Sequence, residues 1–268
     1  MRHISILGCG WLGMNLATHL INNGHKVAGS TTSKSKLEKL LHLQIEAFQM
    51  QLPQQVAVAF FQKAEYLIID IPPQTSAKGP DYHKTCIEAM LPYIKDHQKV
   101  IYVSATSVYP DDNQTIDEKN DLDKTSDRAK ALIQVEELLR TTLGDRLTIL
   151  RMGGLLGYDR IPGRYSAGKS IKGGNEKVNY IHRDDAIAII AEIIKQQQWG
   201  LTLNVVAPRH PTRKAVYNSN VAAYNFEPTE FIDAQKDKKL RQISGIKLEL
   251  LLDYSFIYPD PMHFYYTI

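Results

Sequence analysis

A glycine-rich turn near the start of the chain constrains the fold more than any other feature. Residues 3–13 read HISILGCGWLG, which is a G-x-G-x-x-G motif formed by Gly8, Gly10 and Gly13. The motif follows a short apolar run and precedes an amphipathic segment that should stop at Asn23 and Gly24, so we expect a strand, a tight turn and a helix. The apolar positions are Ile4, Ile6 and Leu7 in the strand and Leu12, Leu16 and Leu20 in the helix.

Each glycine has a distinct physical task in such a turn. Gly8 should allow the tight bend, Gly10 the close approach of a pyrophosphate, and Gly13 the packing of the helix on the strand. The unpaired N–H groups and the positive dipole end of the helix favour a diphosphate. The alternative is a glycine turn with no ligand. The predicted cofactor contacts are Gly8, Gly10, Trp11, Leu12, Gly13, Ser30, Thr31, Thr32, Lys36, Asp70, Ile71, Pro72 and Ser104.

The end of the second predicted strand, residues 25–30, indicates which dinucleotide binds. An NAD site usually places an acid about 20 residues after the first glycine, where it bonds the ribose 2′-OH. Here the chain reads AGSTTSKSK over residues 28–36, and no carboxylate precedes Glu38. Hydroxyl and ammonium groups can donate to a 2′-phosphate, so NADP is the preferred cofactor and NAD the alternative. In a competing interpretation, Ser33 only caps the next helix and the lysines are its solvated face.

The composition excludes several classes of protein. The 268 residues carry 32 basic and 29 acidic side chains, and this near balance argues against a surface that tracks nucleic-acid phosphates. The two cysteines are too few for a disulfide framework, and no metal-type spacing is present, so no metal is expected. No run of about 18 apolar residues occurs and the chain starts on a predicted core strand, so we expect a cytoplasmic protein without a membrane span or leader. The partner should be a small-molecule substrate of unknown identity.

Strands and helices alternate through most of the chain, which predicts an α/β fold with a doubly wound parallel sheet. Residues 1–153 should form the dinucleotide-binding core. Residues 154–268 should complete that core over about 180–206 and add a small C-terminal substrate-cap region. Further predicted strands cover residues 66–71, 99–104, 147–151 and 201–206; predicted helices cover 82–95 and 126–142, and a last one begins at residues 184–185.

Five segments together resemble the extended short-chain dehydrogenase/reductases, and more closely their atypical, YeeZ-like branch of NAD(P)-dependent epimerase/dehydratase relatives. The segments are ILGCGWLG, VIYVSATSVYP, LRMGGLLGYDR, VNYIHRDDA and KLELLLDYSFIYPD, and they span nearly the whole chain. The resemblance implies a Rossmann domain with a small C-terminal substrate-binding region and hydride-transfer chemistry. In that family a Tyr, activated by a Lys four residues on, exchanges the substrate proton, and a Ser or Thr orients the substrate.

The usual proton-handling residues are missing from this sequence. Aligned on residues 135–138, Arg128 stands at the Tyr position and Leu132 at the Lys position; Ala105 stands at the Ser/Thr position. The candidate replacements are Tyr109, Thr106 and Ser104, with Arg128 as a possible holder of an anionic substrate. Each has an ordinary alternative: the hydroxyls can simply satisfy backbone groups or water, and Tyr109 can be a packing residue.

Four further residues have a structural interpretation that outweighs a functional one. His182 precedes a helix, where a lone histidine is usually structural. Asp184 or Asp185 is expected to be the N-cap of that helix rather than a catalytic acid. Cys9 lies beside the expected phosphates, where a thiolate is disfavoured, so we interpret it as a small packing residue.

Two functions remain open from the sequence. The first is an NAD(P)-dependent oxidoreductase or epimerase/dehydratase-like enzyme with atypical catalytic residues. The second is a non-catalytic NADP(H)-binding sensor or regulatory interaction protein. The fold supports both, because a cofactor fingerprint establishes binding and not chemistry. A dinucleotide site that opens on a cap is the usual geometry of a substrate crevice, and this favours the enzyme slightly.

Overall fold

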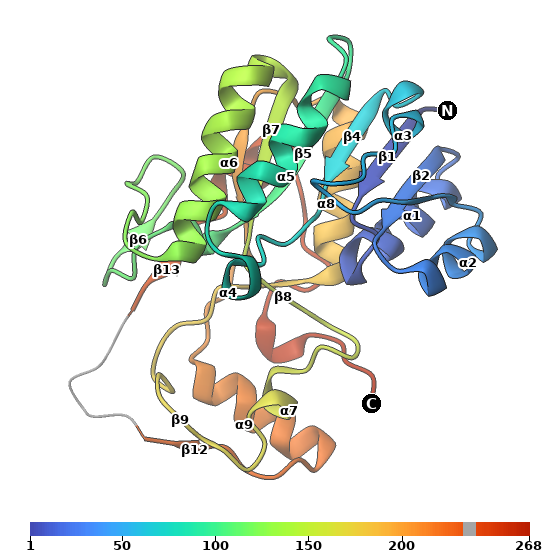
Figure 1. The fold of residues 1–268 in the computed structure, drawn as a ribbon. Helices are drawn as coiled ribbons and strands as arrows, with labels where there is room; N and C mark the ends of the chain where they lie inside the picture. The colour runs from blue at the N-terminus through green and yellow to red at the C-terminus, as the bar shows by residue number, and fades with distance from the viewer. Residues whose placement is uncertain (233–239) are drawn as a thin grey trace. The chain divides into compact units, whose positions relative to one another are not determined.

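The computed structural model describes residues 1–232 and 240–268. Its centre is a seven-stranded parallel sheet flanked by helices, with strand order β11-β7-β5-β4-β1-β2-β3 (Figure 1). The order reverses direction beside β1, so this is the doubly wound Rossmann arrangement that the alternating pattern predicted. The sheet strands are β1 (His3–Leu7), β2 (Lys26–Thr31), β3 (Glu46–Gln49), β4 (Tyr66–Ile69), β5 (Lys99–Ala105), β7 (Leu147–Met152) and β11 (Thr202–Val205).

The chain divides into two compact units whose residues interleave along the sequence. The first contains residues 1–108, 122–151 and 191–202, and the second contains 109–121, 152–190 and 203–268. Helices of the first unit are α1 (Trp11–Asn22), α2 (Lys34–His42), α3 (Ala59–Gln62), α4 (Thr75–Lys78), α5 (Tyr82–Met90) and α6 (Asp127–Leu143), with short 3-10 turns at Leu91–Tyr93, Thr106–Val108 and Gly144–Arg146; α8 (Arg183–Gln196) has residues in both units.

The first unit follows from ordinary helix and strand physics. Every residue of β4 and β7 is buried, as expected of parallel strands covered on both faces. Helix α6 begins where the Ser126 hydroxyl accepts a hydrogen bond from the Ala129 N–H at 3.2 Å, and it ends at Gly144, whose φ is 53°. Helices α5 and α6 run side by side (Figure 1).

Several element boundaries differ from the sequence pattern. The sequence pattern gave no bounds for strand β3, because its four residues are mostly half-exposed and carry no clear alternation. Strand β4 ends at Ile69, so Asp70, Ile71 and Pro72 lie beyond it. Helix α5 ends at Met90 instead of continuing to Lys95, and a 3-10 turn containing Pro92 follows it.

The second unit has its own small core and three two-stranded parallel pairs. The core joins Leu156, Ile161, Ala207, Phe264 and Tyr266. The pairs are β10 with β8, β12 with β9 and β13 with β6. Its elements are β6 (Thr115–Ile116), β8 (Gly154–Leu156), α7 (Pro162–Tyr165), β9 (Ser170–Ile171), β10 (Tyr180–His182), α9 (Arg213–Tyr224), β12 (Glu230–Phe231), β13 (Gln242–Ile243), α10 (Ile246–Leu252) and a 3-10 turn at Pro261–His263.

No helix within residues 1–232 and 240–268 is long and apolar enough to cross a membrane. In the same ranges, no group of three or more His, Cys, Asp and Glu side chains is arranged to hold a metal ion.

Candidate dinucleotide site

The glycine turn after β1 has the close backbone contacts that its sequence predicts. Gly8 has a φ of 103°, and a Cβ there would lie 2.3 Å from the carbonyl oxygen of Asp70. The turn is held from β2: the Gly8 N–H donates to the Ser30 hydroxyl at 3.0 Å, and the Cys9 N–H donates to the Ser30 carbonyl at 2.7 Å. A side chain at Gly8 would therefore disrupt both the bend and its packing on β4.

The start of α1 is packed tightly on one side and open on the other. A Cβ at Gly13 would lie 2.4 Å from the Gly8 carbonyl oxygen, so this glycine lets the helix approach the turn. A Cβ at Gly10 would meet nothing within 4 Å, which leaves room for a ligand against the backbone. No side chain caps the helix and no acidic residue lies in its first turn. An uncapped helix start of this kind favours an anion.

A pocket of about 310 Å³ opens above this turn, entirely within the first unit. Nine of the predicted cofactor contacts line it: Gly8, Gly10, Ser30, Thr31, Thr32, Lys36, Asp70, Ile71 and Pro72. The other four do not: Trp11, Leu12 and Gly13 belong to α1, and Ser104 lies on β5. The volume falls within the range of small-molecule and cofactor sites.

The sequence analysis missed a part of the pocket wall that lies between residues 50 and 86, on either side of the predicted Asp70, Ile71 and Pro72. Its residues are Met50, Leu52, Gln74, Tyr82, His83 and Cys86; Leu7 and Cys9 complete the lining. One available signal was the spacing of Tyr82 and Cys86, four residues apart and therefore on one face of α5. A second feature of this wall can be seen only in the structure. Gln74 has a φ of 53°, a conformation that non-glycine residues adopt mainly under local constraint.

The segment after β2 carries the groups that would meet a ribose 2′ substituent. Ser30 and Thr31 are buried; the Thr31 hydroxyl accepts from the Ser33 N–H at 3.2 Å. Thr32 and Lys36 are exposed at the pocket. Ser33 stands at the N-cap position of α2 but makes no capping hydrogen bond, and its hydroxyl lies 2.8 Å from that of Ser35.

Three titratable groups in the pocket wall are held in their neutral forms by burial. Burial lowers the pKa of His83 to about 4, and its Nε2 lies 2.8 Å from the Tyr102 hydroxyl oxygen. Burial also raises the pKa of the Cys9 thiol to about 12 and raises that of Cys86. A Cys9 thiol of this kind agrees with the packing role expected for it.

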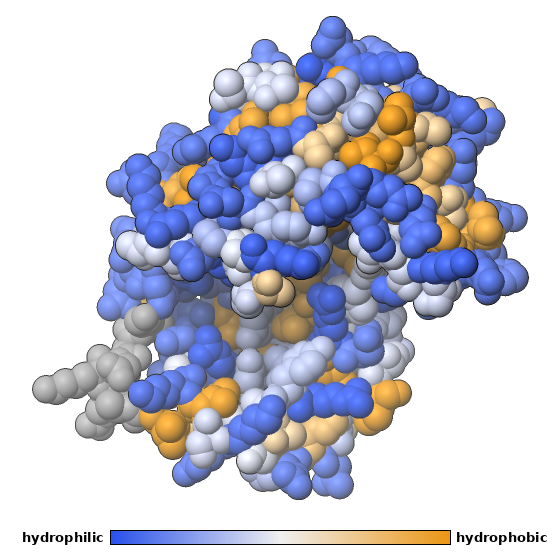
Figure 2. Space-filling model, viewed as in Figure 1, coloured by the Kyte–Doolittle hydropathy of each residue, from blue (hydrophilic) through white to orange (hydrophobic). Residues whose placement is uncertain are grey.

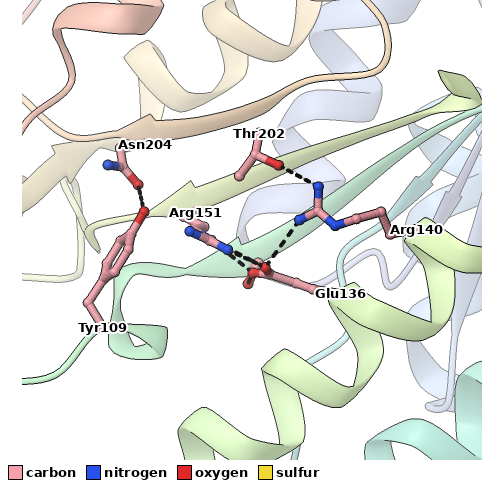
Figure 3. A network of polar contacts seen from close by, with 7 residues as sticks. Tyr109, Glu136, Arg140, Arg151, Thr202 and Asn204 are labelled. Atoms are coloured by element: carbon pink, nitrogen blue, oxygen red, sulfur yellow. Dashed lines mark hydrogen bonds and ion pairs between the residues drawn. The ribbon is translucent and has the colours of Figure 1, made fainter. Parts of the chain in front are cut away.

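The candidate Ser104 belongs to a buried ion-pair cluster. Its hydroxyl donates to Glu136 Oε1 at 2.7 Å, and Glu136 Oε2 lies 2.6 Å from Arg151 Nη2. Figure 3 shows Glu136 between Arg151 and Arg140, with Arg140 also donating to the Thr202 hydroxyl at 3.2 Å. The Ser104 proton is therefore engaged by a carboxylate on α6.

The other catalytic candidates lie in different surroundings. Tyr109, in the second unit, is 2% exposed, and its hydroxyl donates to Asn204 Oδ1 at 2.8 Å (Figure 3). Thr106 is buried in the 3-10 turn after β5. Arg128 is exposed, and its Nε donates to the Ser107 hydroxyl at 3.2 Å. None of these four candidates lines the pocket above the glycine turn.

The residues that stand at the expected Tyr and Lys positions, Arg128 and Leu132, both lie on α6. Arg128, Leu132 and Glu136 follow one another at intervals of four, which places them on the same side of the helix. Leu132 is buried at 3% exposure, so the Lys position is part of the core.

The expected N-cap role of Asp184 or Asp185 is wrong. Helix α8 starts at Arg183, so both aspartates lie inside its first turn. Asp185 is fully buried and accepts hydrogen bonds from the Ile257 N–H at 2.7 Å, the Tyr258 N–H at 3.0 Å and the Tyr254 hydroxyl at 2.8 Å. Asp185 thus ties a distant segment of the second unit, a contact that no local pattern indicates.

His182 has the structural role that was expected of it. It is fully buried, its Nδ1 accepts from the Asp184 N–H at 3.2 Å, and its Nε2 lies 3.1 Å from the Tyr265 carbonyl oxygen. Burial lowers its pKa, so the ring is neutral and donates from Nε2.

Comparison with known proteins agrees with this architecture. The family model for the NAD binding domain of 6-phosphogluconate dehydrogenase matches residues 3–125. Protein YeeZ of Escherichia coli K12 is 29% identical over 269 residues, covering 98% of both chains. UDP-glucuronic acid 4-epimerase from Bacillus cereus in complex with NAD superposes with a TM-score of 0.80 at 16% identity, over 98% of this chain and 97% of that one. A conserved protein of unknown function from Silicibacter pomeroyi gives a TM-score of 0.78 at 17% identity, over 98% and 96% of the two chains.

The sequence match to YeeZ extends across both units, whereas the family model covers the part that contains the glycine turn, β2 and the pocket wall. The similarity to YeeZ over nearly the full length of the chain confirms the resemblance that the five sequence segments indicated. The chain is similar to YeeZ over nearly its full length, and its residues 3–125 match an NAD-binding Rossmann domain.

Proposed function

We propose that this protein binds NADP(H) in the pocket above the glycine turn and uses it in oxidoreductase or epimerase/dehydratase-like chemistry. The proposal rests on two features seen together: the start of helix α1 at Gly10 is open and uncapped, and the end of strand β2 carries no carboxylate. The first feature suits a diphosphate, and the second suits a ribose that bears a 2′-phosphate.

The preference for NADP over NAD rests on Thr32 and Lys36. Both are exposed and both line the pocket directly after β2. Ser30 and Thr31 are buried, whereas Thr32 and Lys36 are exposed, so Thr32 and Lys36 are the groups best able to turn toward a phosphate. Charge-assisted hydrogen bonds from such donors are roughly twice as strong as neutral ones.

Calorimetric titration with NADP+, NADPH, NAD+ and NADH tests this preference. Thr32→Asp and Lys36→Glu should each weaken NADP(H) at least about ten-fold and leave NAD(H) unchanged or tighter, because a carboxylate repels the 2′-phosphate. Lys34→Glu is the matched control, since Lys34 is exposed on the same helix but does not line the pocket. Equal affinities for NADP(H) and NAD(H) in the wild type would reject the preference, and no binding of any of the four would reject the site.

Turnover would need a group that handles the substrate proton. A bound nicotinamide accepts or returns a hydride at carbon, and a protein group must take or give the proton of the substrate hydroxyl as the carbonyl forms or is reduced. The hydroxyls of Ser104 and Tyr109 already donate to Glu136 and Asn204, which leaves Thr106 as the stronger candidate for this role. Arg128 stays protonated and would instead hold an anionic substrate.

Nucleotide sugars are the first substrates to screen, followed by hydroxy acids and carbonyl compounds. The reason is structural likeness alone: the solved neighbours include MoeE5 in complex with UDP-glucose and NAD. Net oxidation or reduction is followed by absorbance of the reduced cofactor, and epimerisation by NMR of the sugar. Tyr109→Phe and Arg128→Ala are compared with the wild type. Loss of a robust rate in Tyr109→Phe, with unchanged cofactor affinity, would make Tyr109 the replacement acid, while a rate that survives both changes would place the site elsewhere.

The second candidate is a non-catalytic NADP(H)-binding sensor or interaction protein. Two hydrogen bonds favour this candidate, because the Ser104 hydroxyl donates to Glu136 and the Tyr109 hydroxyl donates to Asn204 inside the protein. Tight NADP(H) binding with no turnover across the panel supports this candidate. In either case we propose a cytoplasmic protein whose partner is a small molecule and not a nucleic acid. The near balance of 32 basic and 29 acidic residues supports the exclusion of a nucleic acid.

A further inference from the structure

A second pocket lies at the amino ends of the strands of the central sheet, whereas the glycine turn lies at the carboxyl end of β1. It surrounds the first residues of three parallel strands, His3 of β1, Lys26 of β2 and Glu46 of β3, whereas the turn follows the last residue of β1. Its volume is about 390 Å³, and all of its lining belongs to the first unit. The pocket is therefore large enough for a small molecule and separate from the dinucleotide site.

The pocket exists because one face of the sheet is incompletely covered near its edge. Helix α3, which packs there, has only four residues. The parallel register pairs Ala28 with Glu46, and Phe48 lies two residues further along β3, so these side chains share one face. Phe48 and Phe60 meet edge to face with ring centroids 5.6 Å apart. Figure 2 shows apolar side chains at the surface over α3 and the first strands.

The charged groups around this apolar floor are mostly basic. The charged lining residues are Lys26 and Lys63, which are basic, and Glu46, which is acidic; His3 and His25 also line the pocket. The nearby Glu65 is engaged by Arg2 at 2.7 Å and accepts from the His3 N–H at 3.2 Å. The pocket thus combines an aromatic wall with a positive rim, a pairing that suits an organic anion.

One polar atom in this pocket lacks a partner. His25 Nδ1 is buried and has no hydrogen-bond partner among residues 1–232 and 240–268. Burial lowers the pKa of His25, with Arg2 adding to the effect, so the ring is neutral in the free protein. A buried nitrogen left unpaired is costly, and a turn of the His25 ring toward the pocket would let a ligand oxygen accept from an Nδ1–H and remove that cost.

We propose that this pocket binds a small organic carboxylate with an aromatic or branched aliphatic body. The body packs against Phe48 and Phe60, and the carboxylate accepts from His25 Nδ1–H and is neutralised by Lys26 and Lys63. A purely inorganic anion would leave the apolar floor wet, and a neutral analogue would leave the positive rim uncompensated. The site is independent of the proposed cofactor chemistry.

Titration with benzoate, monitored by two-dimensional amide NMR, tests the proposal on the wild-type protein. Benzamide is the matched neutral probe, and acetate is the matched anion without a ring. Benzoate should shift the amides of residues 25–28 and 46–48 and bind at least about ten-fold more tightly than either analogue. The His25 ring should also titrate at higher pH when benzoate is bound, because the carboxylate stabilises the charged form.

Two variants and one control locate the site. His25→Leu removes the donor and Ala28→Leu fills the floor, so each should weaken benzoate at least about ten-fold. His42→Leu is the control, because His42 is exposed on α2 and does not line the pocket. The melting temperature of all three should stay near that of the wild type, which verifies that they fold. Benzoate binding no tighter than benzamide or acetate, or binding unaffected by His25→Leu, would overturn the proposal.

Discussion

The Gly8 N–H donates to the Ser30 hydroxyl across 3.0 Å, which links the turn after β1 to the end of β2. Ser30 also lines the dinucleotide pocket and is 3% exposed. One side chain therefore supports the phosphate-binding turn and forms part of the wall where a 2′ substituent would lie. The two cofactor determinants recognised in the sequence are physically joined through this contact.

Substitutions at Gly13 and Gly10 should separate stability from binding. A Cβ at Gly13 would lie 2.4 Å from the Gly8 carbonyl oxygen, so Gly13→Val should abolish dinucleotide binding and destabilise the fold by about 1–3 kcal/mol. Gly10→Ala has open space around its Cβ and should keep the wild-type melting temperature while weakening the dinucleotide. Thermal-shift titration measures both effects. Full binding by Gly10→Ala would show that no phosphate approaches this backbone.

The buried Glu136–Arg151 pair should be sensitive to loss of one partner. The two side chains are 2% and 4% exposed and meet at 2.6 Å. Arg151→Met should cost about 3–5 kcal/mol of unfolding free energy because it removes the nearest cation from a buried carboxylate, which keeps the Ser104 hydroxyl and Arg140 at 3.9 Å. Urea denaturation gives the value, and the double variant with Glu136→Leu should recover part of the loss. Arg2→Ala, which breaks an exposed pair, is the control and should change little. An additive double variant would contradict direct coupling.

His83 should make the protein less stable as the pH falls from about 6.5 toward 4. Burial lowers its folded-state pKa to about 4, whereas the unfolded value is near 6.5. The unfolded chain then binds the extra proton throughout this window, so stability present above pH 6.5 is lost on acidification. His83→Leu should flatten the slope of unfolding free energy by about 1.4 kcal/mol per pH unit there. Denaturation series between pH 4 and pH 7 measure the difference between the variant and the wild type, and identical slopes would contradict the burial effect.

Asp185 should control the order of the segment around residues 254–258. It accepts three hydrogen bonds from Tyr254, Ile257 and Tyr258, and an Asn would turn an amide group toward at least one of those donors. Asp185→Asn should cost about 2 kcal/mol or more and increase hydrogen exchange in that segment. Asp184→Asn is the control, because Asp184 accepts from the Tyr158 hydroxyl instead. Unchanged exchange in Asp185→Asn would mean that other contacts hold the segment.

The sequence by itself determined the strand–turn–helix at residues 3–22, the roles of Gly8 and Gly13, the parallel α/β fold and the lack of a Tyr-x-x-x-Lys pair on α6. These features depend on residues close together in the chain, where periodicity, glycine freedom and helix spacing act directly. The sequence also predicted nine of the residues that line the pocket above the glycine turn.

Only the tertiary structure decided which distant groups meet. It brought Tyr82, His83 and Cys86 to the glycine turn, and it joined Asp185 to Tyr254 and Ile257. The Ser104 hydroxyl finds its acceptor 32 positions away and that of Tyr109 95 positions away. Such partners depend on strand order, register and helix packing, and a buried polar group is satisfied by whatever acceptor that packing brings within reach.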